Sequence, residues 1–275
     1  MTLLEAIVLG LVQGLTEFIP VSSTAHLRLV PALLGWRDPG AAASAVIQLG
    51  TLLAVVVYFA SDCWRMTVGF VRGLLTRRPL ADADSRLAWY VGLGTVPIVV
   101  IGLAFKDFIR SGARGLWIIS IALVALALVL WLAETMSKRR MLRPMTEMTL
   151  RDAVSMGLGQ TIALIPGCSR SGSTIMTGLF IGLNREAAAR FSFLLSIPAV
   201  FGSGIFELVD ERHHLAALGW EPIVVSIAVS AVSGWLSIWF LLRFLRTHTT
   251  HLFSWYRIAL GVVMMLLLSQ GAIAN

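Results

Sequence analysis

Charged residues are scarce in this chain of 275 residues, since Asp, Glu, Lys and Arg together make up 13% of it. Hydrophobic residues reach 57%, and the mean hydropathy is +0.83. A soluble domain carries about a quarter charged residues, so this composition excludes one and predicts an integral membrane protein. The net charge of +7 does not indicate nucleic-acid binding, because the basic residues lie in short loops between apolar segments.

Cysteine is also scarce. Cys63 and Cys168 lie far apart and have no His or Cys at metal-ligand spacing, which excludes a disulfide framework and a thiolate metal site. The position at which a cysteine phosphatase loop after Cys168 would carry its arginine is Thr174, so we expect Cys168 to be a packing residue. The amino terminus lacks a basic region and has Glu5 inside its first apolar run, which predicts no cleaved signal peptide.

Two halves of the chain repeat one pattern. Residues 1–13 (MTLLEAIVLGLVQ) return as residues 148–160 (MTLRDAVSMGLGQ), and both copies continue into Ile-Pro and a Ser-rich turn. Such duplication is typical of membrane proteins built from internal structural repeats, with the ligand site where the repeats meet. We expect one membrane domain over 1–275, with repeats at about 1–135 and about 148–272.

Hydropathy predicts two kinds of membrane segment. Residues 3–34 and 149–183 are each broken by Pro and a run of Ser, Thr and Gly into two short arms. Polar backbone at membrane depth is tolerated only within protein or beside a wet cavity, so these segments predict re-entrant hairpins; Pro-kinked spans are the alternative. Six other segments approach the length of about 20 residues that crosses a bilayer. They are 41–60, 87–105, 115–133, 187–209, 220–242 and 255–272.

The predicted fold class is therefore an all-α integral membrane protein, with six transmembrane helices and two re-entrant helical hairpins in two inverted-topology repeats. Three spans per repeat is an odd number, so the second repeat enters from the opposite side and the two hairpin tips meet near the midplane. The face richer in Arg and Lys should be cytoplasmic, which places both termini and the mouth of the first hairpin outside. The basic residues of that face are Arg65, Arg72, Arg77, Arg78, Arg86, Lys138, Arg139, Arg140, Arg143, Arg151, Arg243 and Arg246; the opposite face has Lys106, Arg110, Arg114 and Arg212.

The first hairpin tip combines an acid with hydroxyl groups and a histidine. Gln13 and Glu17 are four residues apart and share one helix face, and a carboxylate in an apolar arm predicts a functional site. The alternatives are that Glu17 braces its own turn and that His26 is a packing residue. Pro20 ends the first arm, and hydroxyls at the start of the next arm can cap it while its N–H groups stay free for an anion. These hydroxyls belong to Ser22, Ser23 and Thr24.

The second tip, residues 166–174, reads PGCSRSGST. Free N–H groups and the positive helix end attract phosphate, and Arg170 offers a bidentate fork to phosphate oxygens. Gly167 and Gly172 let the backbone approach a ligand closely. The tip predicts an anion site whose other candidate binding residues are Ser169, Ser171, Ser173 and Thr174.

Residues 13–26 (QGLTEFIPVSSTAH) and 166–174 resemble the two signature segments of the undecaprenyl-pyrophosphate phosphatases, the bacterial bacitracin-resistance family. The likeness covers essentially the whole chain, including 47–50 (IQLG) and 191–198. The family's first signature has Glu or Gln followed four residues later by Glu. This chain has Gln13, so Glu17 is the only carboxylate there.

The resemblance implies hydrolysis of undecaprenyl pyrophosphate to the monophosphate and inorganic phosphate, which recycles the lipid carrier of peptidoglycan synthesis. It also implies a role in cell-wall biogenesis, cell shape and resistance to the antibiotic bacitracin, and a location in the bacterial inner (plasma) membrane. The expected partners are the polyprenyl pyrophosphate and membrane lipid, with no nucleic acid; a homodimer is an open option. The implied cofactor is a divalent cation, Mg²⁺ or alternatively Ca²⁺, with Glu17 as a ligand, and Gln48 joins the substrate-binding residues.

Three attack schemes are compatible with these residues. We prefer Ser23 as nucleophile, with Glu17 or His26 as base and Arg170 stabilising charge; counting from the shared Ile-Pro pairs Ser23 with Ser169. The others are direct attack by water and a phosphorylated His26. A competing function is a transporter or flippase of polyprenyl phosphate lipids, which would not need the Glu–Ser–His cluster. The signatures of type-2 phosphatidate phosphatases are absent.

Overall fold

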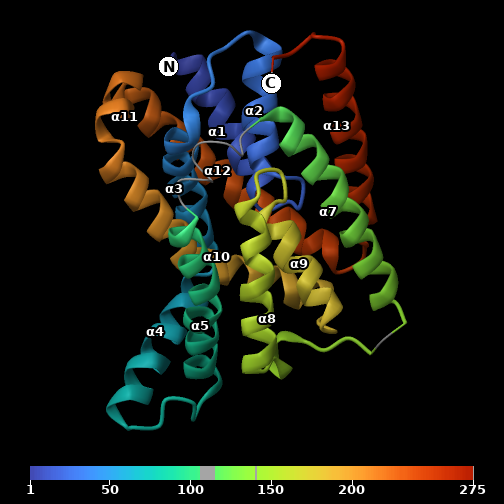
Figure 1. Ribbon diagram of the computed structural model, residues 1–275. Helices are drawn as coiled ribbons and strands as arrows, with labels where there is room; N and C mark the ends of the chain where they lie inside the picture. The colour runs from blue at the N-terminus through green and yellow to red at the C-terminus, as the bar shows by residue number, and fades with distance from the viewer. Residues whose placement is uncertain (106–114, 140, 275) are drawn as a thin grey trace.

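The computed structural model describes residues 1–105, 115–139 and 141–274, and the regular elements in these ranges are helices (Figure 1). Among the described residues, six helices are long and apolar enough to cross a membrane, which confirms the predicted number. They are α3 (Gly40–Tyr58), α5 (Ala83–Ala104), α7 (Leu116–Ser137), α10 (Arg185–Asp210), α12 (Trp220–Leu245) and α13 (His251–Ser269). Four basic residues of the predicted loops lie outside the described residues: Lys106, Arg110, Arg114 and Arg140.

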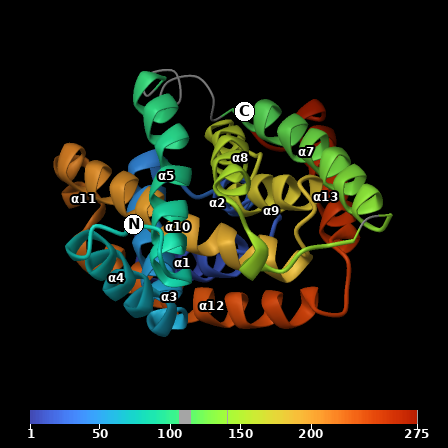
Figure 2. The same cartoon turned by 90° about the horizontal axis from the view of Figure 1, so that it is seen from below.

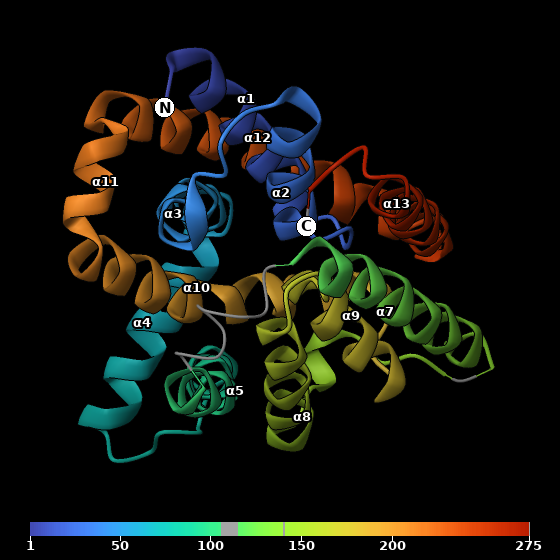
Figure 3. The same ribbon diagram turned by 45° about the horizontal axis from the view of Figure 1, so that its top comes forward.

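Each Pro-broken segment forms a pair of short helices in contact with each other. The first pair is α1 (Leu3–Glu17) and α2 (Ser23–Leu34). The second pair is α8 (Leu150–Thr161) and α9 (Arg170–Phe180), with the 3₁₀ turn Ile162–Leu164 between them. We call residues 18–22 the first tip and residues 165–169 the second tip. In Figure 3, α2 and α9 lie toward the centre of the molecule, with α7 and α13 beside them.

The two pairs begin with the same capping chemistry. Thr2 and Thr149 each cap their helix in a capping box, completed by the acidic side chain three residues later. Ser22 and Ser169 cap α2 and α9, and both hold the left-handed backbone that an L-residue rarely adopts, with φ of 73° and 65°. The helix starts therefore match Ser22 with Ser169, and the expected pairing of Ser23 with Ser169 is off by one residue.

One segment predicted as a loop, residues 61–86, contains the helix α4 (Ala60–Leu75). Cys63 and Met66 pack against the core, and the ring of Phe70 lies 5.2 Å from that of Trp89 on α5. These three residues recur at helical spacing, so their side chains form one apolar stripe along α4. This segment was predicted as a loop because of its arginines. A shorter helix, α11 (Arg212–Leu218), fills the connection between α10 and α12.

Glycines let the short helices approach their neighbours closely. α1 packs against α12, and α8 packs against α5 beside it (Figure 2). A Cβ on Gly14 would lie 1.9 Å from Ser233 Oγ, and one on Gly157 would lie 2.0 Å from the carbonyl oxygen of Gly94. Backbone-to-backbone packing of this kind is common between membrane helices, because small residues bring the two axes together. It fixes the first arm of each pair, and so fixes the tips.

Both chain ends lie at one end of the molecule, and the α4–α5 and α7–α8 connections lie at the other (Figure 1). Two of the predicted basic loops, α4–α5 and α7–α8, therefore lie at the same end of the molecule.

Candidate active site

The two tips meet through side chains from opposite halves of the chain. Arg170, the first residue of α9, donates from Nη2 to Glu17 Oε1 at 2.6 Å. The hydroxyl of Ser171 donates to the carbonyl oxygen of Ile19 at 3.3 Å. The ion pair is largely buried, with 3% of the Glu17 side chain and 14% of the Arg170 side chain exposed. The predicted meeting of acid and base is therefore present.

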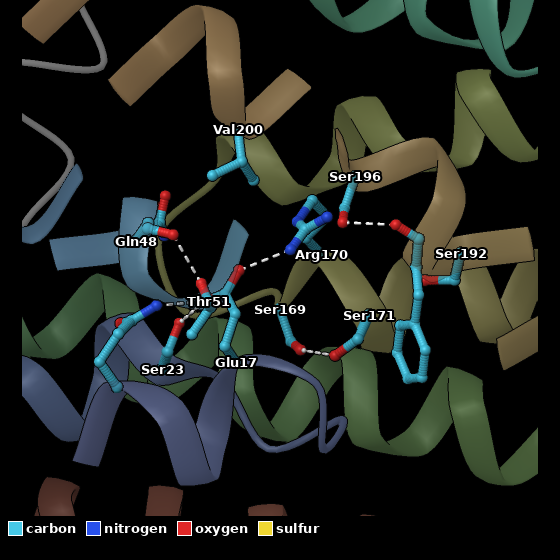
Figure 4. A network of polar contacts seen from close by, with 12 residues as sticks. Glu17, Ser23, Gln48, Thr51, Ser169, Arg170, Ser171, Ser192, Ser196 and Val200 are labelled. Atoms are coloured by element: carbon cyan, nitrogen blue, oxygen red, sulfur yellow. Dashed lines mark hydrogen bonds and ion pairs between the residues drawn. The ribbon is translucent and has the colours of Figure 1, made fainter. Parts of the chain in front are cut away.

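Glu17 is the centre of a polar network (Figure 4). Its Oε2 accepts the hydroxyl of Ser23 at 2.7 Å and the amide of Gln13 at 2.8 Å, while Oε1 accepts Arg170. Gln13, one turn earlier on α1, is fully buried. These three donors fix the carboxylate beside the Ser23 hydroxyl. Its hydrogen bond to Ser23 has the length expected between a nucleophile and its base.

The second tip presents the start of α9 to the same region. The Ser169 hydroxyl accepts the N–H of Gly172 at 3.2 Å, and it lies 3.2 Å from the Ser171 hydroxyl. Helix starts leave their first N–H groups without intrahelical acceptors. Together with the positive end of the helix dipole, these N–H groups favour an anion.

A cavity of about 510 Å³ lies beside the ion pair. Its volume is in the range of small-molecule sites, about 300–1,000 Å³. Seven of the predicted site residues line its polar end: Glu17, Ser22, Ser23, Thr24, Gln48, Ser169 and Arg170. The rest of the wall is mostly apolar and comes from α5, from 163–164 and from α10, including Ile98, Val99, Leu103, Leu164, Val200 and Phe206.

The other predicted binding residues lie behind this wall. The hydroxyl of Thr174 donates to the Arg170 carbonyl at 2.8 Å and lies 2.5 Å from the Ser192 hydroxyl. Ser173 donates to the Ser169 carbonyl at 2.9 Å. Ser171, Gly172, Ser173 and Thr174 do not line the cavity. These contacts support the start of α9, so these four residues hold the site in shape.

His26 is not among the residues that line the cavity either. Its Nδ1 lies 2.8 Å from the carbonyl oxygen of Ser22, and its Nε2 lies 2.7 Å from the hydroxyl of Tyr256 on α13. A carbonyl oxygen only accepts, so Nδ1 carries the proton and Nε2 accepts from the tyrosine. The histidine thus ties α2 to α13, and the structure does not bring it together with Glu17 and Ser23 at the cavity.

The sequence interpretation missed Arg257 and Tyr256. Arg257 is fully buried inside α13, and its guanidinium contacts both tips. A sequence signal was present, because a charged residue inside an apolar span is by itself a functional hypothesis. Tyr256 gave no such signal.

The described residues contain no group of three or more His, Cys, Asp or Glu side chains that could hold a metal ion by themselves. Glu17 is one carboxylate, and the side-chain oxygen of the neighbouring Gln13 is buried without a hydrogen-bond partner. Mg²⁺ is commonly held by one or two carboxylates together with substrate phosphates and water. Gln13 does not line the cavity, so Glu17 is the donor of this pair that a cation in the cavity can reach, and one carboxylate fits a cation that arrives with a phosphate ligand.

Comparison with known proteins gives one consistent result. The family described as "Bacitracin resistance protein BacA" matches residues 6–263. The chain is 52% identical over 278 residues to an undecaprenyl-diphosphatase of Chlorobium phaeobacteroides, covering 98% of this chain and 99% of the relative. It is 51% identical to that of Chloroherpeton thalassium, covering 98% of both chains, and 50% identical to that of Myxococcus xanthus, covering 100% of this chain and 92% of the relative.

Proposed function

The chain belongs to the bacitracin resistance protein BacA family, and on that premise we propose how its cavity works on its substrate. The protein is a membrane undecaprenyl-diphosphatase, which hydrolyses undecaprenyl pyrophosphate to undecaprenyl phosphate and inorganic phosphate. The observation that carries the mechanism is the hydrogen bond from Ser23 to Glu17, beside Arg170, in a cavity with one polar end and one apolar side.

Ser23 is the proposed nucleophile. Its Oγ attacks the terminal phosphorus while its proton passes to Glu17 Oε2, 2.7 Å away. An Oγ–P bond forms, the bridging P–O bond breaks, and undecaprenyl phosphate leaves with the proton that Glu17 passes to its oxygen. Water then attacks the phosphoserine, and the ionised Glu17 takes a proton from that water. Glu17 returns this proton to Ser23 Oγ as the Oγ–P bond breaks, which releases inorganic phosphate and restores the serine hydroxyl. The alternatives are a water activated directly by Glu17 and a phosphorylated His26.

Arg170 and the N–H groups at the start of α9 bind the phosphate in this proposal. Phosphoryl transfer depends chiefly on positioning and on stabilising charge over the transferred oxygens. In the free protein the Arg170 guanidinium donates to Glu17, and an incoming phosphate competes with this carboxylate for the guanidinium. Moving Arg170 to the phosphate leaves Glu17 Oε1 without this donor, while Glu17 Oε2 still faces the Ser23 hydroxyl.

A divalent cation, Mg²⁺ or Ca²⁺, would be held by Glu17, which lines the cavity, and by oxygens of the pyrophosphate and of water. It would neutralise part of the charge on the phosphate oxygens. The residues of this chain place the phosphate and move the proton.

The apolar side of the cavity is the proposed start of the path for the polyprenyl chain. Val99, Leu103 and Phe206 line the cavity and are also 46%, 60% and 43% exposed. An apolar side chain that lines the cavity and faces outward from a membrane helix is in contact with lipid. The substrate would therefore enter sideways between α5 and α10, keeping its chain in the bilayer.

We further propose that the helix pairs are re-entrant and that the two halves are inverted repeats. The longest of their four helices, α1, has 15 residues, which gives about 22 Å at 1.5 Å per residue against about 30 Å of hydrocarbon. The first arm of each pair packs on a span of the other half, α1 on α12 and α8 on α5, as repeats meeting at a shared site would.

Phosphate release from a prenyl pyrophosphate by the purified protein tests the function. We expect turnover with Mg²⁺, loss of at least about 100-fold with excess chelator, consistent with losing one charge-stabilising group, and recovery when the cation is restored. Full turnover under chelation would contradict the cation proposal alone. Transfer of the substrate between leaflets without phosphate release would favour the alternative function, a transporter of polyprenyl phosphate lipids.

The orientation gives a separate prediction. Single cysteines placed at Arg77 and Lys138 should react with an impermeant thiol reagent only from the cytoplasm, because basic loops are retained there. One placed at Gln270, beside the carboxyl terminus, should react only from outside. The background is a chain whose Cys63 and Cys168 are replaced by serine. Labelling of position 270 from the cytoplasm would reverse the orientation.

A further inference from the structure

Arg257 is the largest fully buried side chain among the described residues, with 0% of its surface exposed. It lies in the second turn of α13, a helix apolar enough to cross a membrane. None of the ion pairs within the described part of the chain includes it. A buried guanidinium without a carboxylate is costly unless its N–H groups are hydrogen-bonded, so the acceptors that it uses indicate what it does.

All of its acceptors are backbone carbonyl oxygens, and they come from three separate segments. Nη1 donates to Pro20 of the first tip at 3.3 Å, and Nη2 donates to Gly167 of the second tip at 3.1 Å. Both nitrogens lie 3.3 Å from the Cys168 carbonyl oxygen, and Nε donates to that of Leu123 on α7 at 3.2 Å. One side chain therefore bridges the two tips and fixes both to α7.

We propose that Arg257 is a positioning residue for phosphoryl transfer, which sets the distance between the two tips and orients the backbone of the second tip toward the phosphate. This inference rests on the proposed function. Arg257 does not line the cavity, so it acts through the tips and not on the substrate.

Peptide geometry explains the second part of the proposal. A peptide unit is planar and trans, so its C=O and N–H point in opposite directions. The Cys168 carbonyl points at Arg257, and the N–H of the same peptide unit, which belongs to Ser169, therefore points away from it. Ser169 lines the cavity, and its N–H has no acceptor among the described residues. Arg257 thus aims an N–H toward the place where the phosphate should bind.

Space and shape require an arginine here. A Cβ on Gly172 would lie 2.9 Å from Arg257 Nη1, so the guanidinium packs directly against the start of α9. A lysine has three donors on one nitrogen and cannot reproduce the planar fork that reaches three segments. Arg257→Lys keeps the charge but should let the tips move apart.

The test compares Arg257→Lys with Arg185→Lys, which alters a partly buried arginine that also contacts α7. Arg185 bonds Glu134 at the other end of α7, away from the cavity. We expect kcat of Arg257→Lys to fall about 100-fold, the loss typical of a misplacement of about 1 Å, with KM within about 3-fold because the apolar wall is unchanged. Arg185→Lys should keep kcat even if its melting temperature falls as much. Retained kcat in folded Arg257→Lys, or an equal kcat loss in Arg185→Lys, would overturn the proposal.

A readout without substrate separates this proposal from the mechanism. Spin labels at Leu15, near the first tip, and Ile165, in the second, are both at exposed positions. In a background with Cys63 and Cys168 replaced, the label-to-label distance distribution should shift or broaden in Arg257→Lys and stay unchanged in Arg185→Lys. An unchanged distribution in Arg257→Lys would reject the positioning role whatever the activity. Failure of the wild-type protein to release phosphate would reject the proposed function, leaving the distance result to stand.

Discussion

Arg170→Ala and Glu17→Ala should each lower kcat/KM by about 100-fold or more, because removing one charge-stabilising or proton-transferring group costs about 2.7 kcal/mol or more in the transition state. The two side chains meet at 2.6 Å from opposite halves of the chain and line the same cavity. In the proposed mechanism the two residues have different roles, since Arg170 binds the transferred phosphate and Glu17 accepts a proton from Ser23. Initial rates of phosphate release measure both effects.

Either alanine variant leaves a buried charge without its partner, and such a change destabilises a protein. Activity must therefore be compared in folded protein, by size-exclusion profile and melting temperature in detergent. Arg170→Lys and Glu17→Gln are gentler variants, since lysine keeps the charge and glutamine keeps the shape. We expect both to lose most activity, because lysine lacks the bidentate fork and glutamine is not a base.

Arg28→Ala is a matched control on the same helix pair. Arg28 lies in α2 and pairs with Asp38 at 2.9 Å, but neither residue lines the cavity. Its loss should leave kcat/KM within about 3-fold of the wild type, in line with the small energies of partly exposed ion pairs. Near wild-type rates for folded Arg170→Ala or Glu17→Ala would refute the site assignment.

The fold could be predicted from the sequence where hydropathy and repetition carried the information. Long apolar runs gave six spans, and the two Pro-broken segments gave pairs of short helices. α4 was missed because its arginines outweighed a narrow apolar stripe that is stabilised by packing against the core and α5. Proline positions predict where a helix ends, whereas the N-cap serine determines where the next helix begins. The pairing of Ser23 with Ser169 was counted from the prolines and is therefore off by one residue.

The site was predictable as far as residue chemistry decides it. Glu17, Ser23 and Arg170 stood out as polar groups in apolar segments, and the structure brings them together. Sequence spacing does not say which side of a tip a residue faces, because the turn between two helices sets that angle. His26 therefore looked close to Glu17 and instead contacts Tyr256. Arg257 lies in the segment 255–272, which was predicted as a transmembrane helix from its apolar length without regard to the arginine inside it.

Ser23→Ala should remove nearly all turnover, and this result would separate the nucleophile schemes. Ser23 Oγ lies 2.7 Å from Glu17 Oε2 and lines the cavity, so it has both a base and access to the phosphorus. Ser22 instead caps α2, with its hydroxyl 3.4 Å from the Ala25 N–H. Ser22→Ala and Thr24→Ala should keep a measurable fraction of activity, with altered phosphate binding.

His26→Gln should be slowed by about 10-fold rather than inactive, because positioning a group through one hydrogen bond is worth about 1.4 kcal/mol. Tyr256→Phe removes the hydroxyl that donates to His26 and should have a similar, smaller effect.

If Ser23 attacks, acid quenching during turnover of a substrate radiolabelled in its terminal phosphate should trap label on Ser23, and Ser23→Ala should trap none. Substantial turnover by Ser23→Ala with none by Glu17→Gln would favour direct attack by water. Turnover by Ser23→Ala with none by His26→Gln would assign the nucleophile or base to the histidine, and α2 would then have to rotate to bring that ring from Tyr256 to the cavity.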